Sequence, residues 1–174
     1  MKCLKIDAMP VAITLFRLFL TLPTLYLLLE GRTTLAGFLI LLAGVSDWLD
    51  GELARRNNKV SQFGLLLDPL VDKIFVLSVL SFFLYRQEIG LLPFVLLLLR
   101  ELSVSFLRSL SVEKGYAMPA SYLGKAKAFF EFLTLLALSF ERGPAELLLW
   151  LSILLAYVSL YDYLLKYLSY GDGR

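Results

Sequence analysis

The sequence predicts an all-α integral membrane protein, with six transmembrane helices in one bundle. Three observations lead to this fold class. Of the 174 residues, 59% are hydrophobic, which exceeds the roughly half that is usual in soluble domains. Six apolar runs are each long enough to cross about 30 Å of hydrocarbon, which takes about 20 helical residues. The connections between the runs are short, so neighbouring helices are expected to be antiparallel.

The six runs follow one another along the whole chain, separated by the turn-like strings EGRT, RRNNKVSQ, RQEIG, VEKGYAMPASY and ERGPAE. Arg17 interrupts the first run and no A-x-A site follows it, so this run is expected to be an uncleaved span rather than a signal peptide. The fifth run is short. With no long linker or internal repeat, residues 1–174 are expected to form a single domain. The expected spans are 11–29, 33–54, 63–85, 90–112, 124–140 and 145–166.

The basic residues predict the orientation in the membrane, because cytoplasmic segments are enriched in Lys and Arg. Of the 17 basic residues, ten fall in segments on the N-terminal side, and only Arg32, Arg86 and Arg142 fall in loops on the other side. Both termini are therefore expected to be cytoplasmic, in a multi-pass protein of the cell inner (cytoplasmic) membrane. The ten are Lys2, Lys5, Arg55, Arg56, Lys59, Lys114, Lys125, Lys127, Lys166 and Arg174.

Charged residues inside the spans gather at one depth. At about 1.5 Å per residue, most of them lie about one to two helical turns from an expected cytoplasmic helix end. The active site is therefore expected in the cytoplasmic half of the bundle. Arg100 and Glu101 lie nearer the middle of the membrane and do not fit this layer. The residues of the layer are Arg17, Asp47, Asp50, Asp68, Asp72, Arg108, Glu131 and Asp162.

Four aspartates lie in the second and third spans, where a carboxylate is costly. Asp47 and Asp50 are three residues apart and Asp68 and Asp72 are four apart, so each pair shares one helix face. Four clustered carboxylates cannot all stay ionised without positive charge nearby. Arg55 could neutralise one of them, whereas two divalent cations would neutralise all four, as in the two-metal sites of phosphoryl chemistry. Solvation at a helix end is the alternative for any single aspartate.

The sequence contains no histidine. This removes the commonest metal ligand and the commonest general base, so any chemistry must use carboxylates, Lys, Tyr or Arg. Oxygen-only ligands favour Mg²⁺ or Mn²⁺ over Zn²⁺. The single cysteine, Cys3, excludes an internal disulfide.

The string from Asp47 to Asp72 reads D-x-x-D-G-x-x-A-R-x8-G-x3-D-x3-D and resembles the signature of the CDP-alcohol phosphatidyltransferase family at every specified position. The six-span plan extends the resemblance over nearly the whole chain. The resemblance implies a six-helix membrane enzyme, usually a homodimer, with two Mg²⁺ or Mn²⁺ ions at the aspartates. It also implies transfer of a phosphatidyl group from CDP-diacylglycerol to an alcohol, with release of CMP.

The resemblance implies roles for single residues as well. Asp47, Asp50 and Asp68 would be metal ligands. Asp72 would touch the metal site and act as the catalytic base on the acceptor hydroxyl. Arg55 would contact the pyrophosphate or a carboxylate. The residues that would line the CDP pocket are Gly51, Ala54, Arg55 and Gly64.

A phosphorylated acceptor needs fixed cations near the metal site. Arg108 and Arg17 lie deep in their spans, and arginine suits phosphate because its planar fork binds two oxygens at once. Lys125 and Lys127 complete the predicted acceptor-phosphate site. Either lysine could instead extend towards anionic lipid head groups.

The strings ITLFR, DWLDGELARR, FGLLLDPLVDK, RE and GKAK resemble bacterial family members that use glycerol 3-phosphate as acceptor. We therefore expect sn-glycerol 3-phosphate as the acceptor alcohol. One departure is Ala8, which stands where these members commonly carry the Asn of an Asn-x-Pro sequence ahead of Pro10. The alternatives within the family are phosphatidylglycerol, which would give cardiolipin, and an inositol phosphate.

A divalent-cation transporter is the remote alternative from another class. It predicts acidic or amide groups through the whole membrane depth, whereas the acids concentrate on the cytoplasmic side. Membrane lipids are expected to surround the protein, and no nucleic-acid partner is expected. The residues assigned to interfacial anchoring or bundle packing are Trp48, Trp150, Tyr161, Tyr163, Tyr167 and Tyr170.

The remaining buried charges leave several roles open. Glu101 shares a face with Ser105 and Arg108, so it could orient Arg108 through a polar chain. Arg100 and Glu101 could equally be satisfied by neighbouring helices or at a dimer interface. Glu131 and Asp162 could pair with the acceptor-site cations, or they could serve only as buried structural acids.

Overall fold

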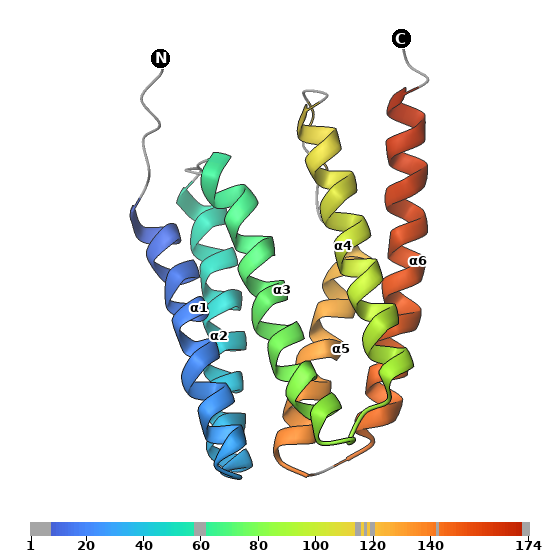
Figure 1. Cartoon of the computed structure of the whole chain (residues 1–174). Coiled ribbons are helices and arrows are strands. Elements are labelled where there is room, and N and C mark those ends of the chain that lie inside the picture. The colour runs from blue at the N-terminus through green and yellow to red at the C-terminus, as the bar shows by residue number, and fades with distance from the viewer. Residues whose placement is uncertain are drawn as a thin grey trace. The chain divides into compact units, whose positions relative to one another are not determined.

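The computed structural model consists of six α-helices in the part of the chain that it describes (Figure 1). Each expected span corresponds to one helix, which confirms the all-α prediction and the order of the elements. The described backbone comprises residues 8–57, 62–113, 116, 118, 121–141 and 143–171. The helices are α1 (Ala8–Leu29), α2 (Thr33–Asn57), α3 (Gln62–Tyr85), α4 (Leu91–Glu113), α5 (Tyr122–Ser139) and α6 (Ala145–Gly171).

The chain divides into two compact units. The first comprises Met1–Phe82 with Ser139–Glu141, and the second comprises Phe83–Leu138 with Arg142–Arg174. The first unit therefore contains α1, α2 and most of α3, and the second contains α4, most of α5 and α6.

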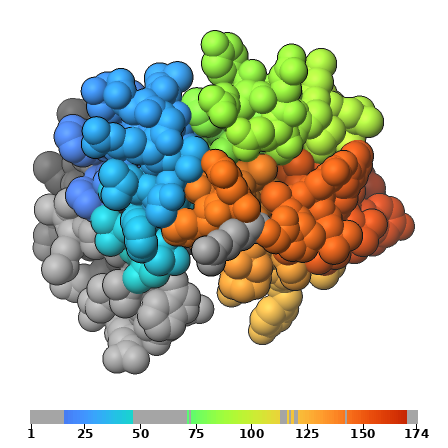
Figure 2. All heavy atoms as spheres, turned by 90° about the horizontal axis from the view of Figure 1, so that it is seen from below, coloured from blue at the N-terminus to red at the C-terminus, as the bar shows by residue number. Residues whose placement is uncertain are grey.

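In the first unit, α1 and α2 pack against each other as a helical hairpin. Figure 2 shows their described atoms, in blue, in contact around the end where the turn lies. The N–H of Arg32 donates to the carbonyl of Leu27 at 2.9 Å, and the N–H of Gly31 donates to the carbonyl of Leu28 at 3.1 Å. Gly31 has a φ of 73°, which glycine adopts without steric cost, so EGRT closes α1 with a Schellman motif.

A second glycine permits a close approach in the same unit. A Cβ on Gly37 would lie 2.9 Å from Cζ of Phe140. The Phe140 ring also meets the ring of Phe38 edge-on, with centroids 5.7 Å apart. Because residue 37 has no side chain, the turn after α5 can pack against α2.

In the second unit, α4 packs against α6, and α5 begins at a defined cap. The Oγ of Ser121 accepts the N–H of Gly124 at 3.0 Å. The carbonyl of Ser121 accepts the N–H of Lys125 at 3.1 Å. Ser121 is therefore the N-cap of α5, a position that serine favours because its side chain satisfies a free N–H of the first turn.

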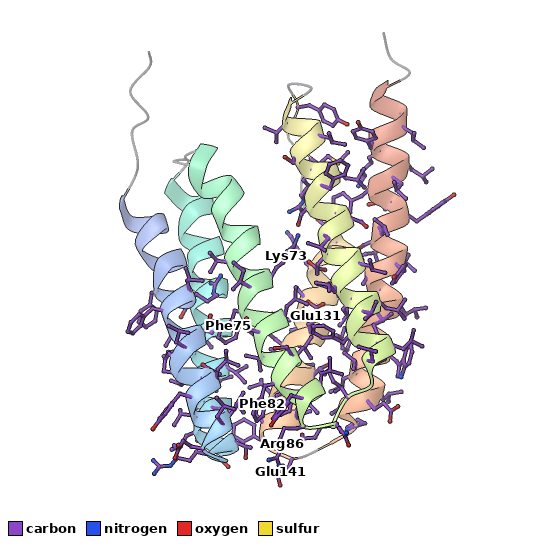
Figure 3. The ribbon with its side chains drawn as sticks, viewed as in Figure 1. Lys73, Phe75, Phe82, Arg86, Glu131 and Glu141 are labelled. Carbon is purple, nitrogen blue, oxygen red and sulfur yellow. The ribbon has the colours of Figure 1, made fainter. Side chains whose placement is uncertain are left out.

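The distribution of exposed apolar and buried charged side chains differs from that in a water-soluble protein. Phe19 and Leu22 are 69% and 70% exposed, whereas Arg100 and Lys127 are only 5% and 4% exposed. Soluble proteins seldom bury Lys or Arg and seldom expose so many large apolar side chains. In Figure 3 side chains made mostly of carbon project outward along the helices of each unit. This pattern is typical of a protein surrounded by lipid.

Length and apolar composition identify one stretch of the described residues, Ala145–Ser169 in α6, as sufficient to cross a membrane. Charged residues interrupt the apolar runs of α4 and α5, so these helices do not qualify by composition alone. The expectation of six spans is thus confirmed as six helices, but not as six continuous apolar spans. Shorter apolar stretches are Phe16–Leu29, Thr33–Ser46 and Lys73–Tyr85.

Candidate active site

The four predicted metal ligands belong to two helices of the first unit. Asp47 and Asp50 lie in α2, and Asp68 and Asp72 lie in α3. The helical spacing on which the metal prediction depends is therefore present. The side chains of all four lie outside the described set, so their predicted roles stay predictions. The same is true of the predicted CDP-pocket residues Gly51, Ala54, Arg55 and Gly64.

A buried tyrosine joins three segments of the second unit. Tyr163 of α6 is only 1% exposed. Its hydroxyl oxygen accepts hydrogen bonds from Nη2 of Arg108 in α4 at 2.8 Å and from the backbone N–H of Ser121 at 3.0 Å. The Arg108 guanidinium carbon also lies 5.2 Å from the centroid of the Tyr163 ring. Arg108, Tyr163 and Ser121 form what we call the Tyr163 cluster.

A second polar group in this unit consists of Arg100, Glu101, Lys127 and Glu131, which we call the Glu101 network. Oε1 of Glu101 accepts from Nη1 of Arg100 at 2.7 Å and from Nζ of Lys127 at 2.5 Å. Lys127 Nζ also pairs with Oε2 of Glu131 at 2.5 Å. Figure 3 labels Glu131 on α5. All four side chains are buried, and their two positive and two negative charges balance.

Arg100 extends the Glu101 network to α6. Its Nε donates to the carbonyl of Ala156 at 3.0 Å, and its Nη2 donates to Oγ of Ser159. The network therefore links α4, α5 and α6 through side chains that would be costly to leave unpaired in a membrane. Several roles were left open for Arg100 and Glu101. The structure supports the one in which groups on neighbouring helices pair with their charges.

The predicted acceptor-site cations differ in their surroundings. Arg108 is partly buried and hydrogen-bonded to a neutral phenol, whereas Lys127 is buried between two carboxylates. Lys125 is exposed, with Nζ 5.7 Å from the centroid of the Tyr122 ring. Arg17 is buried in α1, which belongs to the first unit.

Sequence reasoning assigned Tyr163 to interfacial anchoring or packing and missed its polar role. The signal available was weak, because the residue lies among several tyrosines near the end of α6. Arg108 meets Tyr163, whereas the predicted polar chain ran through Ser105, whose Oγ donates to the main-chain carbonyl of Glu101 at 2.8 Å. Asp162 forms a largely exposed ion pair with Lys166 at 2.8 Å.

Comparison with known sequences identifies the protein family. The family model described as CDP-alcohol phosphatidyltransferase matches residues 7–158. The chain belongs to this family. It is therefore an enzyme of the transferase class, and members of the family generally depend on a divalent metal.

Individual relatives agree with this assignment. A Rickettsia bellii protein named CDP-diacylglycerol–glycerol-3-phosphate 3-phosphatidyltransferase is 33% identical over 138 residues, which is 74% of this chain and 76% of that protein. A Haemophilus influenzae protein of the same name is 30% identical over 167 residues, or 89% and 90% of the two chains. A Streptomyces coelicolor cardiolipin synthase (CMP-forming) is 42% identical over 89 residues, or 51% and 41%.

Proposed function

We propose that this CDP-alcohol phosphatidyltransferase transfers the phosphatidyl group of CDP-diacylglycerol to sn-glycerol 3-phosphate, forming phosphatidylglycerophosphate and releasing CMP. The observation that carries the choice of a phosphorylated acceptor is the state of Arg108. The relatives named for glycerol 3-phosphate support the particular acceptor, because they match over most of both chains.

Arg108 has the properties of a phosphate ligand. Among the described residues no carboxylate pairs with it, and its hydrogen-bond partner is the neutral Tyr163. Its Nε is buried and has no hydrogen-bond partner in the described part of the chain. Buried donors are nearly always satisfied in a working structure. A phosphate oxygen would satisfy the N–H and balance the charge with a strong, charge-assisted hydrogen bond.

Arg17, Lys125 and Lys127 are proposed as further positive charge for the acceptor phosphate. Lys127 contributes least to the local charge, because two carboxylates already bind its ammonium group. Lys125 contributes from an exposed position. Arg108 is thus the principal ligand in this proposal.

The donor set on α2 and α3 fits two divalent cations. It offers the carboxylates of Asp47, Asp50, Asp68 and Asp72, and oxygen donors of this kind suit Mg²⁺ or Mn²⁺. When bound, such ions neutralise the charge of a diphosphate and of the departing phosphate. The residues proposed to line the CDP pocket are Gly51, Ala54, Arg55 and Gly64.

The proposed reaction is a direct displacement. Asp72 accepts the proton of the acceptor hydroxyl, and the hydroxyl oxygen forms a bond to the phosphorus that carries diacylglycerol. The bond from that phosphorus to the bridging diphosphate oxygen breaks, and the oxygen leaves as part of CMP. No covalent enzyme intermediate forms. Arg108 holds the acceptor phosphate, so the hydroxyl is presented in one orientation.

Several larger features complete the proposal. The exposed apolar side chains and buried charges support six membrane-spanning helices. We place both termini and the active site on the cytoplasmic side of the inner membrane, from the distribution of Lys and Arg. Because the family model runs through both compact units, we propose that they act as one domain. A homodimer in contact with membrane lipids is the proposed assembly.

Phosphatidylglycerol is the second candidate acceptor, which would make the product cardiolipin. It is favoured by the cardiolipin synthase of Streptomyces coelicolor, although that match covers only 51% of this chain. The two acceptors differ in their phosphate: glycerol 3-phosphate carries a terminal dianion, whereas phosphatidylglycerol carries a diester.

The test is CMP release by purified protein with CDP-diacylglycerol and a panel of acceptors, namely glycerol 3-phosphate, phosphatidylglycerol, inositol phosphate and glycerol. We expect glycerol 3-phosphate to give the highest kcat/KM. Equal activity with glycerol would contradict a phosphate-reading site. Chelation should abolish CMP release and Mg²⁺ or Mn²⁺ should restore it.

A single substitution tests the assignment of the base. Asp72→Asn should lower kcat by about 10²–10⁴, as expected for a lost general base, while CDP-diacylglycerol still binds. Near-normal turnover would place the base elsewhere. A trapped phosphatidyl-aspartate would replace direct displacement with a two-step route.

A further inference from the structure

We infer that Tyr163 is a positioning residue for acceptor recognition: its hydroxyl fixes the Arg108 guanidinium in the orientation that binds the acceptor phosphate. The inference rests on the proposed function, since it takes Arg108 as the phosphate ligand. It assigns a role to the oxygen atom of a residue whose ring alone would be sufficient for packing.

Two different contacts with the same side chain determine how Arg108 lies. Nη2 donates to the Tyr163 hydroxyl at 2.8 Å, and the guanidinium carbon is 5.2 Å from the ring centroid. A guanidinium is planar and rigid, so fixing one nitrogen while placing the group near an aromatic ring limits the directions of the remaining N–H groups. The hydroxyl is neutral, so it orients Arg108 without cancelling its charge.

The same oxygen also holds the start of α5. It accepts the backbone N–H of Ser121 at 3.0 Å, and Ser121 is the N-cap of that helix. Space beside residue 124 is limited, because a Cβ on Gly124 would lie 3.2 Å from Ser121 Oγ, a tight contact, and 3.7 Å from the Tyr163 hydroxyl. The hydroxyl thus couples Arg108 to the N-cap of α5, in whose first turn Lys125 lies.

The geometry makes Tyr163→Phe informative. The substitution keeps the ring and removes only the acceptor, which leaves the Nη2 of Arg108 and the N–H of Ser121 without their partner. We expect the KM for glycerol 3-phosphate to rise about tenfold, the scale of one buried hydrogen bond. The KM for CDP-diacylglycerol should stay within about twofold, because the CDP pocket is proposed on other helices. Tyr161→Phe is the matched control, since Tyr161 lies on the same helix and is 65% exposed.

A double-mutant cycle separates positioning from general structural damage. In an Arg108→Ala background, Tyr163→Phe should raise the acceptor KM no further, because the residue that it orients is gone. Equal and additive effects on the acceptor KM in both backgrounds would overturn the inference. So would a rise in both substrate KM values, or an unchanged acceptor KM in folded Tyr163→Phe.

Folding is checked by thermal unfolding in detergent, and Tyr163→Met serves as the second variant. Methionine can fill the space flexibly but offers no oxygen, so it should reproduce the selective rise in acceptor KM. If neither variant folds, Tyr163 acts in folding alone and the inference is wrong. Failure of the proposed function is distinguishable, because unmodified protein would then release no CMP with glycerol 3-phosphate.

Discussion

The Glu101 network and the Tyr163 cluster use the same helices in opposite ways. In each, an arginine of α4 reaches α6: Arg100 bonds to Ala156 and Ser159, and Arg108 bonds to Tyr163. The two arginines are eight residues apart, or about 12 Å along the helix. Glu101 balances the charge of Arg100, whereas no described carboxylate balances that of Arg108. A balanced cation holds helices together, and an unbalanced one can bind an anion.

The largest expected effect concerns the balanced network. Lys127→Met removes the ammonium group that Glu101 and Glu131 share. Removing one partner of a buried ion pair costs about 3–5 kcal/mol, because the remaining charge stays buried. We expect a loss of that size in the free energy of unfolding, measured by denaturation in detergent.

Lys166→Met is the matched control for this loss. Lys166 also pairs with an acid four residues away, Asp162, but the two side chains are 46% and 36% exposed. Exposed pairs contribute about 0–1 kcal/mol. Similar losses for the two variants would contradict the distinction between a buried network and a surface pair.

The next effect concerns the unbalanced cation. Arg108→Ala should raise the KM for glycerol 3-phosphate about 10- to 100-fold, because a hydrogen bond to a charged group contributes about 1.5–3 kcal/mol. Stability should change much less than in Lys127→Met, since no described carboxylate loses a partner. Steady-state CMP release measures the KM. Arg86→Ala, at an exposed pair with Glu88, is the control, and an equal rise there would remove the special role of Arg108.

The sequence predicted the helices well and the polar contacts poorly, for a physical reason. Apolar run length is a local property, so 33–54 and 63–85 anticipated α2 and α3 to within a few residues. The aspartate spacing is equally local. Contacts between helices are not: Tyr163 is 55 residues from Arg108 and carries no motif that marks it as a polar partner.

Lys127 illustrates the same limit within one residue. Glu131 stands four residues later, so their pairing could be read from helical periodicity. Glu101 is 26 residues away, and its share in binding the ammonium group appears only when α4 and α5 are seen together. The predicted phosphate ligand is therefore also a structural cation, and its substitution should affect folding more than recognition.

A smaller effect is expected where the Glu101 network meets α6. Ser159→Ala removes the hydroxyl that accepts from Arg100 and donates to the carbonyl of Ala156. We expect a loss of about 1–2 kcal/mol in the free energy of unfolding, since one buried donor of Arg100 loses its partner. Ser169→Ala is the control, because Ser169 makes the same kind of bond to the carbonyl of Lys166 at an exposed position. Equal losses would mean that the Arg100 contact contributes nothing.

The smallest effect is expected at Lys125, which is exposed while Arg108 is partly buried. Its charge lies in the first turn of α5, which Ser121 of the Tyr163 cluster caps. Lys125→Ala should therefore raise the KM for glycerol 3-phosphate about two- to threefold at low salt, as for a screened surface charge. Ionic strength makes this prediction sharp, because the Debye length falls from about 10 Å at 0.1 M salt to about 3 Å at 1 M. The difference between Lys125→Ala and unmodified protein should therefore vanish at high salt, whereas the effect of Arg108→Ala should persist. A large effect of Lys125→Ala that salt does not reduce would place Lys125 in direct contact with the phosphate. The contrast between an exposed and a partly buried cation would then fail.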